Sequence, residues 1–523
     1  MANHYFVGSG IASLAGAVYL IRDGGVEGKD IVILEESTDF GGALDAKGTP
    51  ASGYFMSGSR MFESKYNCTF ELLSSIPAGT DPAISVTDET NRVRAENTWH
   101  NHARLVDRSG AVTDFHHLGF TERERVDLLA IVAAPERALD SKRISDCFAP
   151  HFFQSNFWYE WCTLFAFQPW HSAIEFKRYL LRFMHHFSTI DTQEGIYRTH
   201  YNQYESIAIP IVRWLRERGV TIRFGTSALD LGFASGADGK TVESIDIERA
   251  GRRSTLAVGQ HDCVFVTNGS MTADKAFGSM SSAPILDRSR RSGAWQLWET
   301  LARGRPQFGN PAAFDGHIDE SVWESFTVTV SDPLFLKLIE NFTGSVPGRG
   351  GLTTFKDSNW LLTLSIFHQP FFANQPAGVS VWWGYGLYYD QPGNYVNKPM
   401  AQCSGREILE EVLGHLHFSA ADKDAILGSS NVIPCVMPYI TSQFLVRKAG
   451  DRPPVIPKGS TNLAFIGQYS EVPDDVVFTV EYSIRSAAIA VYGLLGLAKK
   501  PMPIYKGAHD PRVLFAALET LHR

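Results

Sequence analysis

Cysteine is scarce and scattered in this sequence. The chain has six cysteines among 523 residues, and no two of them form a C-x-x-C pair. Disulfide frameworks and structural zinc sites depend on closely spaced cysteines, so neither is expected here. The pattern predicts buried free thiols in a protein of a reducing compartment, and therefore a cytoplasmic location.

Long hydrophobic runs and dense basic clusters are also missing. The longest late apolar run, residues 486–498, is shorter than the roughly 20 residues that a membrane-spanning helix needs. The first apolar stretch has no basic leader and is broken by Gly8 and Gly10, which argues against a signal or transit peptide. Lys and Arg number 48 against 56 Asp and Glu, a net charge of −8. A basic surface for nucleic acid therefore has no support.

The composition is that of a large globular protein. Apolar residues make up 44% of the chain and charged residues 20%, which excludes fibrous and disordered classes. At roughly 150 residues per domain, the length corresponds to about three domain-sized units. Neither an internal repeat nor a low-complexity tract is present.

The first 35 residues predict a nucleotide site. A short β-rich run, residues 4–7, is followed by a glycine turn with Gly8 and Gly10 and then by a helix-forming stretch. A second strand, residues 30–34, ends in Glu35. In such a βαβ unit the glycines let the backbone approach a pyrophosphate, the helix N-terminus attracts it, and the acid accepts hydrogen bonds from the ribose.

The residues around this unit favour FAD as the cofactor. Ser13 stands where a third glycine is usual, and it is still small enough for the helix to pack closely on the strand. An acid at the end of the second strand favours a free 2′-hydroxyl, hence FAD or NAD rather than NADP. A second glycine pair, Gly41 and Gly42, follows at once and suits a flavin nucleotide that extends further into the protein.

Strand-like runs return late in the chain, at residues 220–224, 241–247, 262–266 and 463–467. Residues 78–200, which precede these runs, are rich in helix and aromatics, and an aromatic strand-like run lies at 381–389. The aromatics of the first part either line an apolar pocket or form a packed core. We predict an α/β fold with a discontinuous Rossmann-like FAD-binding domain, an interleaved β-rich substrate domain, a helical lid and C-terminal helices. The predicted boundaries are 1–77, 201–290 and 441–498 for the FAD domain, 78–200 for the helical lid or substrate insertion, 291–440 for the substrate domain and 499–523 for the C-terminal segment.

Other chemistries lack a motif. Three histidine pairs are present without an H-E-x-x-H or cysteine pattern, so no metal is expected; they are His100 and His102, His116 and His117, and His185 and His186. No G-x-S-x-G elbow is present for a serine hydrolase. The strand at 262–266 ends in a small polar turn that includes Asn268 and Ser270, which can bring the backbone near a dinucleotide.

Several blocks along the chain resemble the FAD-dependent oleate hydratases, formerly called myosin-cross-reactive antigens. They cover most of the chain in the family's order: residues 8–15 (GSGIASLA), 41–45 (GGALD), 167–173 (FQPWHSA), 202–206 (NQYES), 267–272 (TNGSMT), 382–387 (WWGYGL), 437–444 (MPYITSQF) and 478–483 (FTVEYS). The resemblance implies addition of water to the cis-9 double bond of oleic or a similar unsaturated fatty acid. The product is a 10-hydroxy acid, and FAD is required without net redox change.

The resemblance also assigns roles to residues. It implies that Tyr204 protonates the alkene, for which a phenol of reference pKa about 10 carries the proton at neutral pH. It places the cofactor against a loop with Gly58, Ser59, Arg60 and Met61, and against Asn268, Ser270, Phe478 and Thr479. Thr441, Ser442 and Gln443, with Arg447, form a polar cluster that either binds the fatty acid carboxylate, caps a turn or touches the flavin.

The loop departs from the family pattern at Met61, where the family has the glutamate that activates water. Methionine cannot accept a proton, so we expect other groups to orient the water: backbone amides of residues 58–61 or the flavin. Glu63 is a nearby carboxylate and a weaker alternative. Loss of the glutamate also leaves two rivals open, a flavin-dependent oxidoreductase and a non-catalytic FAD-containing fatty-acid binding protein.

Two expectations concern partners. The first strand begins within a few residues of Met1, without the longer leader of many family members, and we expect a monomer or weak homodimer. Lys499, Lys500 and Lys506 flank the apolar run 513–518, a pattern that either rests on an anionic membrane or packs on the protein surface.

Overall fold

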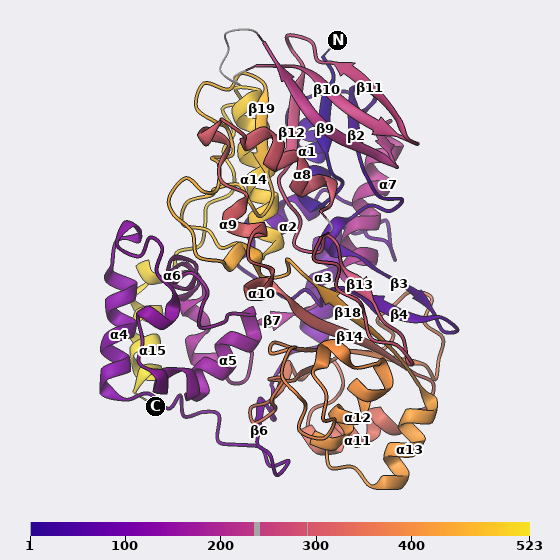
Figure 1. The fold of residues 1–523 in the computed structure, drawn as a ribbon, viewed down its shortest axis with the longest axis vertical. Helices are drawn as coiled ribbons and strands as arrows, with labels where there is room; N and C mark the ends of the chain where they lie inside the picture. Colours follow the sequence, from indigo (N-terminus) through magenta and orange to yellow (C-terminus); the bar gives the residue numbers. More distant parts are fainter. Residues whose placement is uncertain (1, 235–240, 290, 523) are drawn as a thin grey trace.

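A computed structural model describes residues 2–234, 241–289 and 291–522. The upper half in Figure 1 contains a parallel sheet with the order β19-β12-β1-β2-β8. Its strands are β1 (His4–Val7), β2 (Ile31–Leu34), β8 (Thr221–Arg223), β12 (Cys263–Thr267) and β19 (Leu463–Ile466). They come from both ends and the middle of the chain, which confirms the predicted α/β class and the discontinuous Rossmann-like domain.

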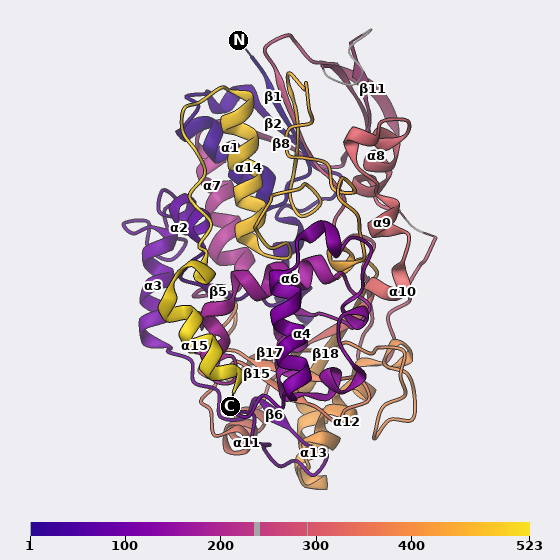
Figure 2. The same ribbon diagram turned by 90° about the vertical axis from the view of Figure 1, so that its left-hand side faces the viewer.

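Two helices from opposite ends of the sequence cover one face of this sheet. α1 (Ile11–Arg22) and α14 (Val480–Leu494) lie side by side, as Figure 2 shows. The approach of α1 to β1 is close, because a Cβ at Gly16 would lie 2.6 Å from the Phe6 ring. α7 (Ile209–Glu217) packs beside α1. The N- and C-terminal segments thus build one α/β unit.

A small antiparallel sheet lies beside the parallel one, at the upper right in Figure 1. Its strands are β9 (Thr226–Phe233), β10 (Val242–Arg249) and β11 (Arg252–Ala257). α8 (Gly293–Ala302) packs on β9.

The lower half contains a mixed sheet with the order β13-β18-β14-β17-β16-β15-β6. Its strands are β6 (Leu105–Val106), β13 (Ala276–Phe277), β14 (Trp323–Val330), β15 (Leu352–Phe355), β16 (Thr363–Ile366), β17 (Ser380–Gly386) and β18 (Ser430–Met437). β14 is buried along its whole length, because the sheet is covered on both faces. Three helices lie beneath it in Figure 1: α11 (Leu334–Thr343), α12 (Gly405–His415) and α13 (Ala420–Ser429). β6 and β13 lie outside residues 291–440, and the domain boundaries stay predictions.

The segment 78–200 is mainly helical. Its α-helices are α3 (Val86–Glu96), α4 (Glu122–Ala133), α5 (Asn156–Phe165) and α6 (Ala173–Arg182). Phe152, Phe157 and Trp158 are buried, and the Phe152 ring contacts the other two, so they form a core. Phe165, by contrast, lines a cavity described below. Some aromatic residues of this segment therefore form a packed core, and others line an apolar pocket.

The chain ends in α15 (Pro511–Leu521), which packs on the 3-10 helix η6 (Met184–Thr189). Arg125 Nε donates a hydrogen bond of 2.7 Å to the Leu521 carbonyl. Leu514, Phe515 and Leu518 stay exposed. Among the described residues, no helix is both long enough and apolar enough to cross a membrane.

Short elements connect these parts. β3 (Ala46–Thr49) and β4 (Gly53–Met56) form a hairpin whose second strand packs on β14 and β18. β5 (Phe62–Glu63) pairs with β7 (Ile196–Tyr197). The remaining helices are α2 (Asn67–Leu73), α9 (Ala312–Asp315), α10 (Ile318–Ser321) and the π-helical turn η7 (Tyr204–Ala208). The other 3-10 turns are η1 (Gly28–Asp30), η2 (Gly42–Leu44), η3 (Glu136–Ala138), η4 (Ile144–Asp146), η5 (Pro150–Gln154), η8 (Pro306–Phe308), η9 (Met400–Gln402), η10 (Ser442–Phe444) and η11 (Gly507–His509). All six cysteines are described and free, and all but Cys147 are buried.

Candidate functional site

A cavity of about 700 Å³, called here the larger cavity, lies at the carboxyl ends of β1, β2 and β12. Ligands of open α/β sheets bind at this edge. Its wall includes nine of the residues predicted to hold the cofactor: Gly8, Gly10, Glu35, Gly41, Gly42, Arg60, Ser270, Phe478 and Thr479. The sequence patterns of four separate segments therefore meet around one cavity.

The first glycine turn is shaped for close approach of a ligand. Gly8 has φ +87°, a left-handed conformation that side-chain-bearing residues rarely adopt. Gly10 caps α1, and a Cβ added there would meet no atom within 4 Å. The backbone at the helix N-terminus therefore faces open space, which is the arrangement that binds an anion.

Glu35 lies just past the end of β2 and holds this turn. One of its carboxylate oxygens accepts hydrogen bonds from Ser9 N at 2.8 Å and Ser9 Oγ at 2.6 Å. The other accepts from Ser37 N at 2.8 Å. The carboxylate thus lies on the cavity wall with its orientation already fixed.

The second glycine pair presses against the first turn. Gly41 and Gly42 have φ +96° and +55°, and Gly41 N donates to the Ser9 carbonyl at 3.0 Å. A Cβ on Gly42 would lie 3.2 Å from Gly10 Cα. The pair therefore packs backbone against backbone at the cavity floor.

Two predicted cofactor residues lie behind the cavity wall. Ser13 Oγ is 3.2 Å from Thr267 Oγ1, so Ser13 joins α1 to β12, consistent with the close packing expected of a small residue. Asn268 is fully buried, and neither its side-chain nitrogen nor its oxygen has a hydrogen-bond partner among the described residues.

Tyr204 lines the larger cavity at the start of η7. A π-helical turn of this kind is rare and is often found at functional sites. Burial raises the pKa of Tyr204 to about 12, so its phenol keeps the proton at neutral pH. The preceding residue, Gln203, donates from Nε2 to the Gly58 carbonyl at 2.9 Å, which ties the tyrosine segment to the loop with Met61.

That loop leads to a second cavity of about 110 Å³, called here the smaller cavity. Gly58, Ser59 and Met61 line this cavity, whereas Arg60 lines both cavities. Phe478 and Thr479 are also shared. The structure therefore places Tyr204 and Met61 on different cavities that adjoin at a common wall.

The smaller cavity is mostly apolar. Its wall includes Phe165, Phe183, Trp323, Trp383 and Ile440. A cleft of this chemistry is suited to a hydrocarbon chain.

Glu63 also lines the smaller cavity, but its carboxylate is already engaged. Arg182 Nη2 lies 3.0 Å from Glu63 Oε1, and His185 Nε2 lies 3.3 Å from Oε2. Although burial opposes ionisation, hydrogen bonds from the histidines and the charge of Arg182 hold the pKa of Glu63 below its usual range. A carboxylate stabilised in its ionised form is a weak base, which counts against Glu63 as the group that activates water.

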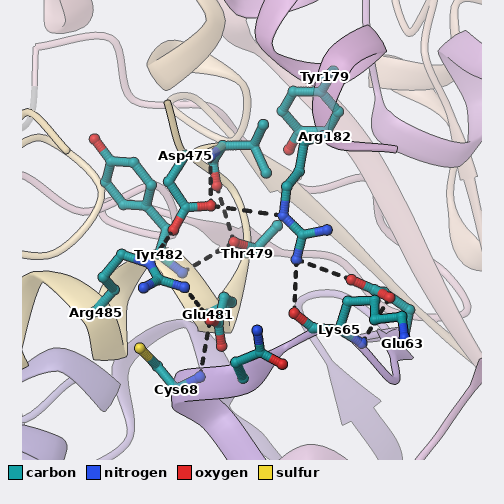
Figure 3. Close-up of polar contacts among 12 residues, drawn as sticks. Glu63, Lys65, Cys68, Tyr179, Arg182, Asp475, Thr479, Glu481, Tyr482 and Arg485 are labelled. Carbon is teal, nitrogen blue, oxygen red and sulfur yellow. Dashed lines mark hydrogen bonds and ion pairs between the residues drawn. The ribbon is translucent and has the colours of Figure 1, made fainter. Parts of the chain in front are cut away.

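Figure 3 shows that Glu63 belongs to a chain of buried ion pairs. Arg182 lies between Glu63 and Asp475, with Nε 4.0 Å from Asp475 Oδ1. Arg485 Nε lies 2.6 Å from Asp475 Oδ2, and its Nη2 lies 2.5 Å from Glu481. This series of ion pairs fixes α14, and with it Thr479, against the loop of the smaller cavity.

Glu63 also belongs to a group of side chains that could ligate a metal. Ligand atoms of Glu63, His185 and His186 lie within 4.8 Å of one another. The sequence patterns predict no metal, and the guanidinium of Arg182 beside Glu63 opposes a second cation there.

The polar cluster at residues 441–443 lies on neither cavity wall. Thr441 Oγ1 donates to the Ser321 carbonyl, and Ser442 Oγ lies 2.5 Å from Tyr469 Oη. Gln443 Nε2 donates to the Ile440 carbonyl, and Arg447 pairs with Glu175. These contacts favour the turn-capping alternative over carboxylate binding.

Sequence reasoning missed Arg198, a buried arginine on the wall of the smaller cavity. Its closeness to the block at 202–206 was the one available signal. Its main contacts come from residues more than 130 positions away, Ser59 and Ser365, and nothing in a single sequence pairs them.

Comparison with known proteins agrees with this architecture. The model of the MCRA family matches residues 2–492. The chain is 37% identical to an oleate hydratase of Streptococcus pyogenes serotype M49 (strain NZ131), over 99% of this chain and 89% of that protein. It is 32% identical to a linoleate hydratase of Lactiplantibacillus plantarum, over 98% of this chain and 97% of that protein. A solved oxidoreductase from Methanosarcina mazei shares the fold, with a TM-score of 0.52 and 11% identity over 94% of this chain and 100% of that one.

Proposed function

The chain belongs to the MCRA family, and from this premise we propose that it is a fatty acid hydratase, a lyase that adds water to the cis-9 double bond of oleic acid or a similar unsaturated fatty acid. The product is a 10-hydroxy acid. The hydratases that match nearly its whole length support this reaction. The structural observation that carries the proposal is the meeting of a dinucleotide-sized cavity and an apolar one at Arg60, Phe478 and Thr479.

We propose FAD as the cofactor, because the residues of the larger cavity fit a dinucleotide. The open space at Gly10, in front of the N-terminus of α1, suits a pyrophosphate. Glu35 stands where an adenosine ribose is held. When bound, FAD would supply a planar ring beside the reacting carbons without net electron transfer. Phe478, Thr479 and Arg60 would contact it at the shared wall.

Tyr204 is the proposed general acid. Its phenol keeps its proton at neutral pH, since burial raises its pKa to about 12. Such a weak acid protonates an alkene only when it is held against the double bond in a dry site. Its place on the cavity wall, against the closely packed Gly41, supports that geometry.

Water activation proceeds without a carboxylate at Met61 in this proposal. The backbone N–H groups of residues 58–61 would orient the water, and the attack would depend on positive charge that develops as Tyr204 donates its proton to one alkene carbon. As the water oxygen bonds to the other carbon, the proton that it loses would return to the Tyr204 phenolate, so that the acid is regenerated. Acid catalysis then supplies most of the rate acceleration.

Incubation of the purified, FAD-loaded protein with oleic acid in heavy-oxygen water tests the function. The reaction is run anaerobically, with and without a flavin reductant, and the lipid is analysed by mass spectrometry. We expect one labelled oxygen in a hydroxystearate. Reduction of the flavin by the substrate would instead indicate an oxidoreductase, and bound oleate without any product would indicate a fatty-acid binding protein.

A further inference from the structure

Arg198 is a buried cation without a matching anion. The residue is 3% exposed. Nε donates to Ser59 Oγ at 2.9 Å and Nη2 donates to Ser365 Oγ at 2.7 Å, while Nη1 has no partner among the described residues. Hydroxyl groups solvate a guanidinium but do not neutralise it, so burial lowers the pKa of Arg198 to about 9.

Several other buried arginines in this protein form ion pairs with carboxylates. Arg182, Arg447 and Arg485 each have a carboxylate oxygen within 3.0 Å. A buried charge normally requires such a partner, because desolvation costs several kcal/mol per ion. Arg104 is also fully buried without an ion pair in the described part of the chain, but its hydrogen bonds go to Thr354, Thr163 and the Glu160 carbonyl, and it lines neither cavity. Arg198 differs because it has no paired carboxylate among the described residues and lines the smaller cavity. The missing anion is therefore expected to be a ligand.

The guanidinium is held in one orientation. Its carbon lies 4.5 Å from the ring centre of Trp99 and 5.1 Å from that of Phe367. The two hydrogen bonds to serines fix the remaining freedom. A planar guanidinium that is held in this way can present two parallel N–H groups to a carboxylate.

The surroundings select the class of anion. Arg198 lines the smaller cavity, whose other walls are mostly aromatic and aliphatic. The carboxylate on that wall, Glu63, is already paired with Arg182. A cation at an apolar wall matches an anionic amphiphile.

We propose that Arg198 binds the carboxylate of the fatty acid in the smaller cavity, with the alkyl chain directed past Arg60 and Phe478 toward Tyr204. This assignment rests on the proposed hydratase function and replaces residues 441–443 as the head-group site. A charge-assisted, bidentate contact of this kind favours the ionised head group by about 10- to 100-fold in affinity.

Binding of oleate and of oleamide, its neutral analogue, tests the proposal. We expect the wild-type protein at pH 7.5 to bind oleate at least about 10-fold more tightly than oleamide. Arg198→Met should reduce this preference to about one, mainly by weakening oleate, and Arg198→Lys should keep part of it. In turnover, Arg198→Met should raise KM for oleate more than it lowers kcat.

Gln443→Leu is the matched control at the rival head-group site, and it should leave the preference unchanged. Melting temperature and FAD content establish that each variant is folded. Should Arg198→Met not fold, the wild-type comparison still decides, because equal binding of oleate and oleamide overturns the proposal. A preference that survives in Arg198→Met, or disappears in Gln443→Leu, also overturns it. If the protein forms hydroxystearate but binds oleate and oleamide equally, only the Arg198 site is refuted. If it prefers oleate to oleamide but forms no hydroxystearate, the hydratase function is refuted.

Discussion

The ring of Tyr204 stacks on that of Phe40, with centroids 5.1 Å apart and planes 24° apart. Phe40 directly precedes Gly41, and a Cβ at Gly41 would lie 3.2 Å from the Tyr204 ring. The proposed proton donor is therefore held against the glycine pair of the larger cavity. This contact couples the position of the acid to the loop that would hold the cofactor.

Replacing Tyr204 with Phe should abolish hydration while FAD stays bound. The substitution removes the donated proton and leaves the ring stack intact, and loss of a general acid costs roughly 10²- to 10⁴-fold in rate. Product formation by mass spectrometry and flavin absorbance are the measurements. Tyr201→Phe, in the same segment, is the control and should keep activity. A Tyr204→Phe enzyme with normal turnover would exclude the phenol as the acid.

Placing a carboxylate at Met61 should raise the hydration rate. Met61 lines the smaller, mostly apolar cavity, where burial would raise the pKa of a glutamate toward the range of an effective general base. We expect Met61→Glu to increase kcat by about 10-fold or more, the scale of general-base catalysis. Met61→Gln has nearly the same size without the basic oxygen and should show no gain. An equal gain in both variants would point to polarity rather than base catalysis.

The parts of the site that the sequence predicted are those built from local patterns. Gly8, Gly10 and Glu35 belong to one βαβ unit, in which strand, turn and helix follow one another along the chain. The wall of the larger cavity therefore could be predicted in large part. Asn268 shows the limit of this reasoning, since Ser270 of the same turn lines the larger cavity while the Asn268 side chain is fully buried and does not.

The residues of the smaller cavity could not be assigned from the sequence, because their roles depend on contacts that no local pattern encodes. Glu63 is neutralised by Arg182, more than 100 positions away, and this pairing decides that the carboxylate is a structural group. The role proposed for Arg198 follows from the absence of a paired carboxylate in the part of the protein that the structure describes. Tertiary packing alone reveals which buried charges are paired, so the sequence by itself offers only the polar residues 441–443 as a head-group site.

Adding a single methyl group at Gly10 should weaken FAD binding without destabilising the protein. A Cβ there would meet no protein atom, and the φ of −68° suits alanine, so the methyl group would enter only the space of the ligand. We expect Gly10→Ala to lower FAD affinity by about 10-fold or more, an overpacking cost of about 1–3 kcal/mol, with an unchanged melting temperature of the apoprotein. Gly16→Ala is the opposite control, because its Cβ would lie 2.6 Å from the Phe6 ring. It should lower the melting temperature of the apoprotein.

Glu175 should contribute strongly to stability at neutral pH. It is fully buried, and Arg447 and Arg452 lie 2.7 and 2.8 Å from its carboxylate. Although burial opposes ionisation, these arginines lower the pKa of Glu175 to about 2. Removing one partner of such a buried pair costs about 3–5 kcal/mol, so Glu175→Gln should markedly lower the urea midpoint at pH 7.

The pH dependence of this effect has a defined sign. The folded pKa of Glu175 is below its ordinary value of 4.5, so its contribution is complete above about pH 4.5 and is lost as the pH falls toward 2. The difference in urea midpoint between wild type and Glu175→Gln should therefore shrink between pH 5 and pH 3. Glu136→Gln removes a carboxylate that is 39% exposed beside Arg178, and it should cost at most about 1 kcal/mol. A difference for Glu175→Gln that stays constant with pH would mean that packing of the side chain, rather than its charge, holds this part of the core together.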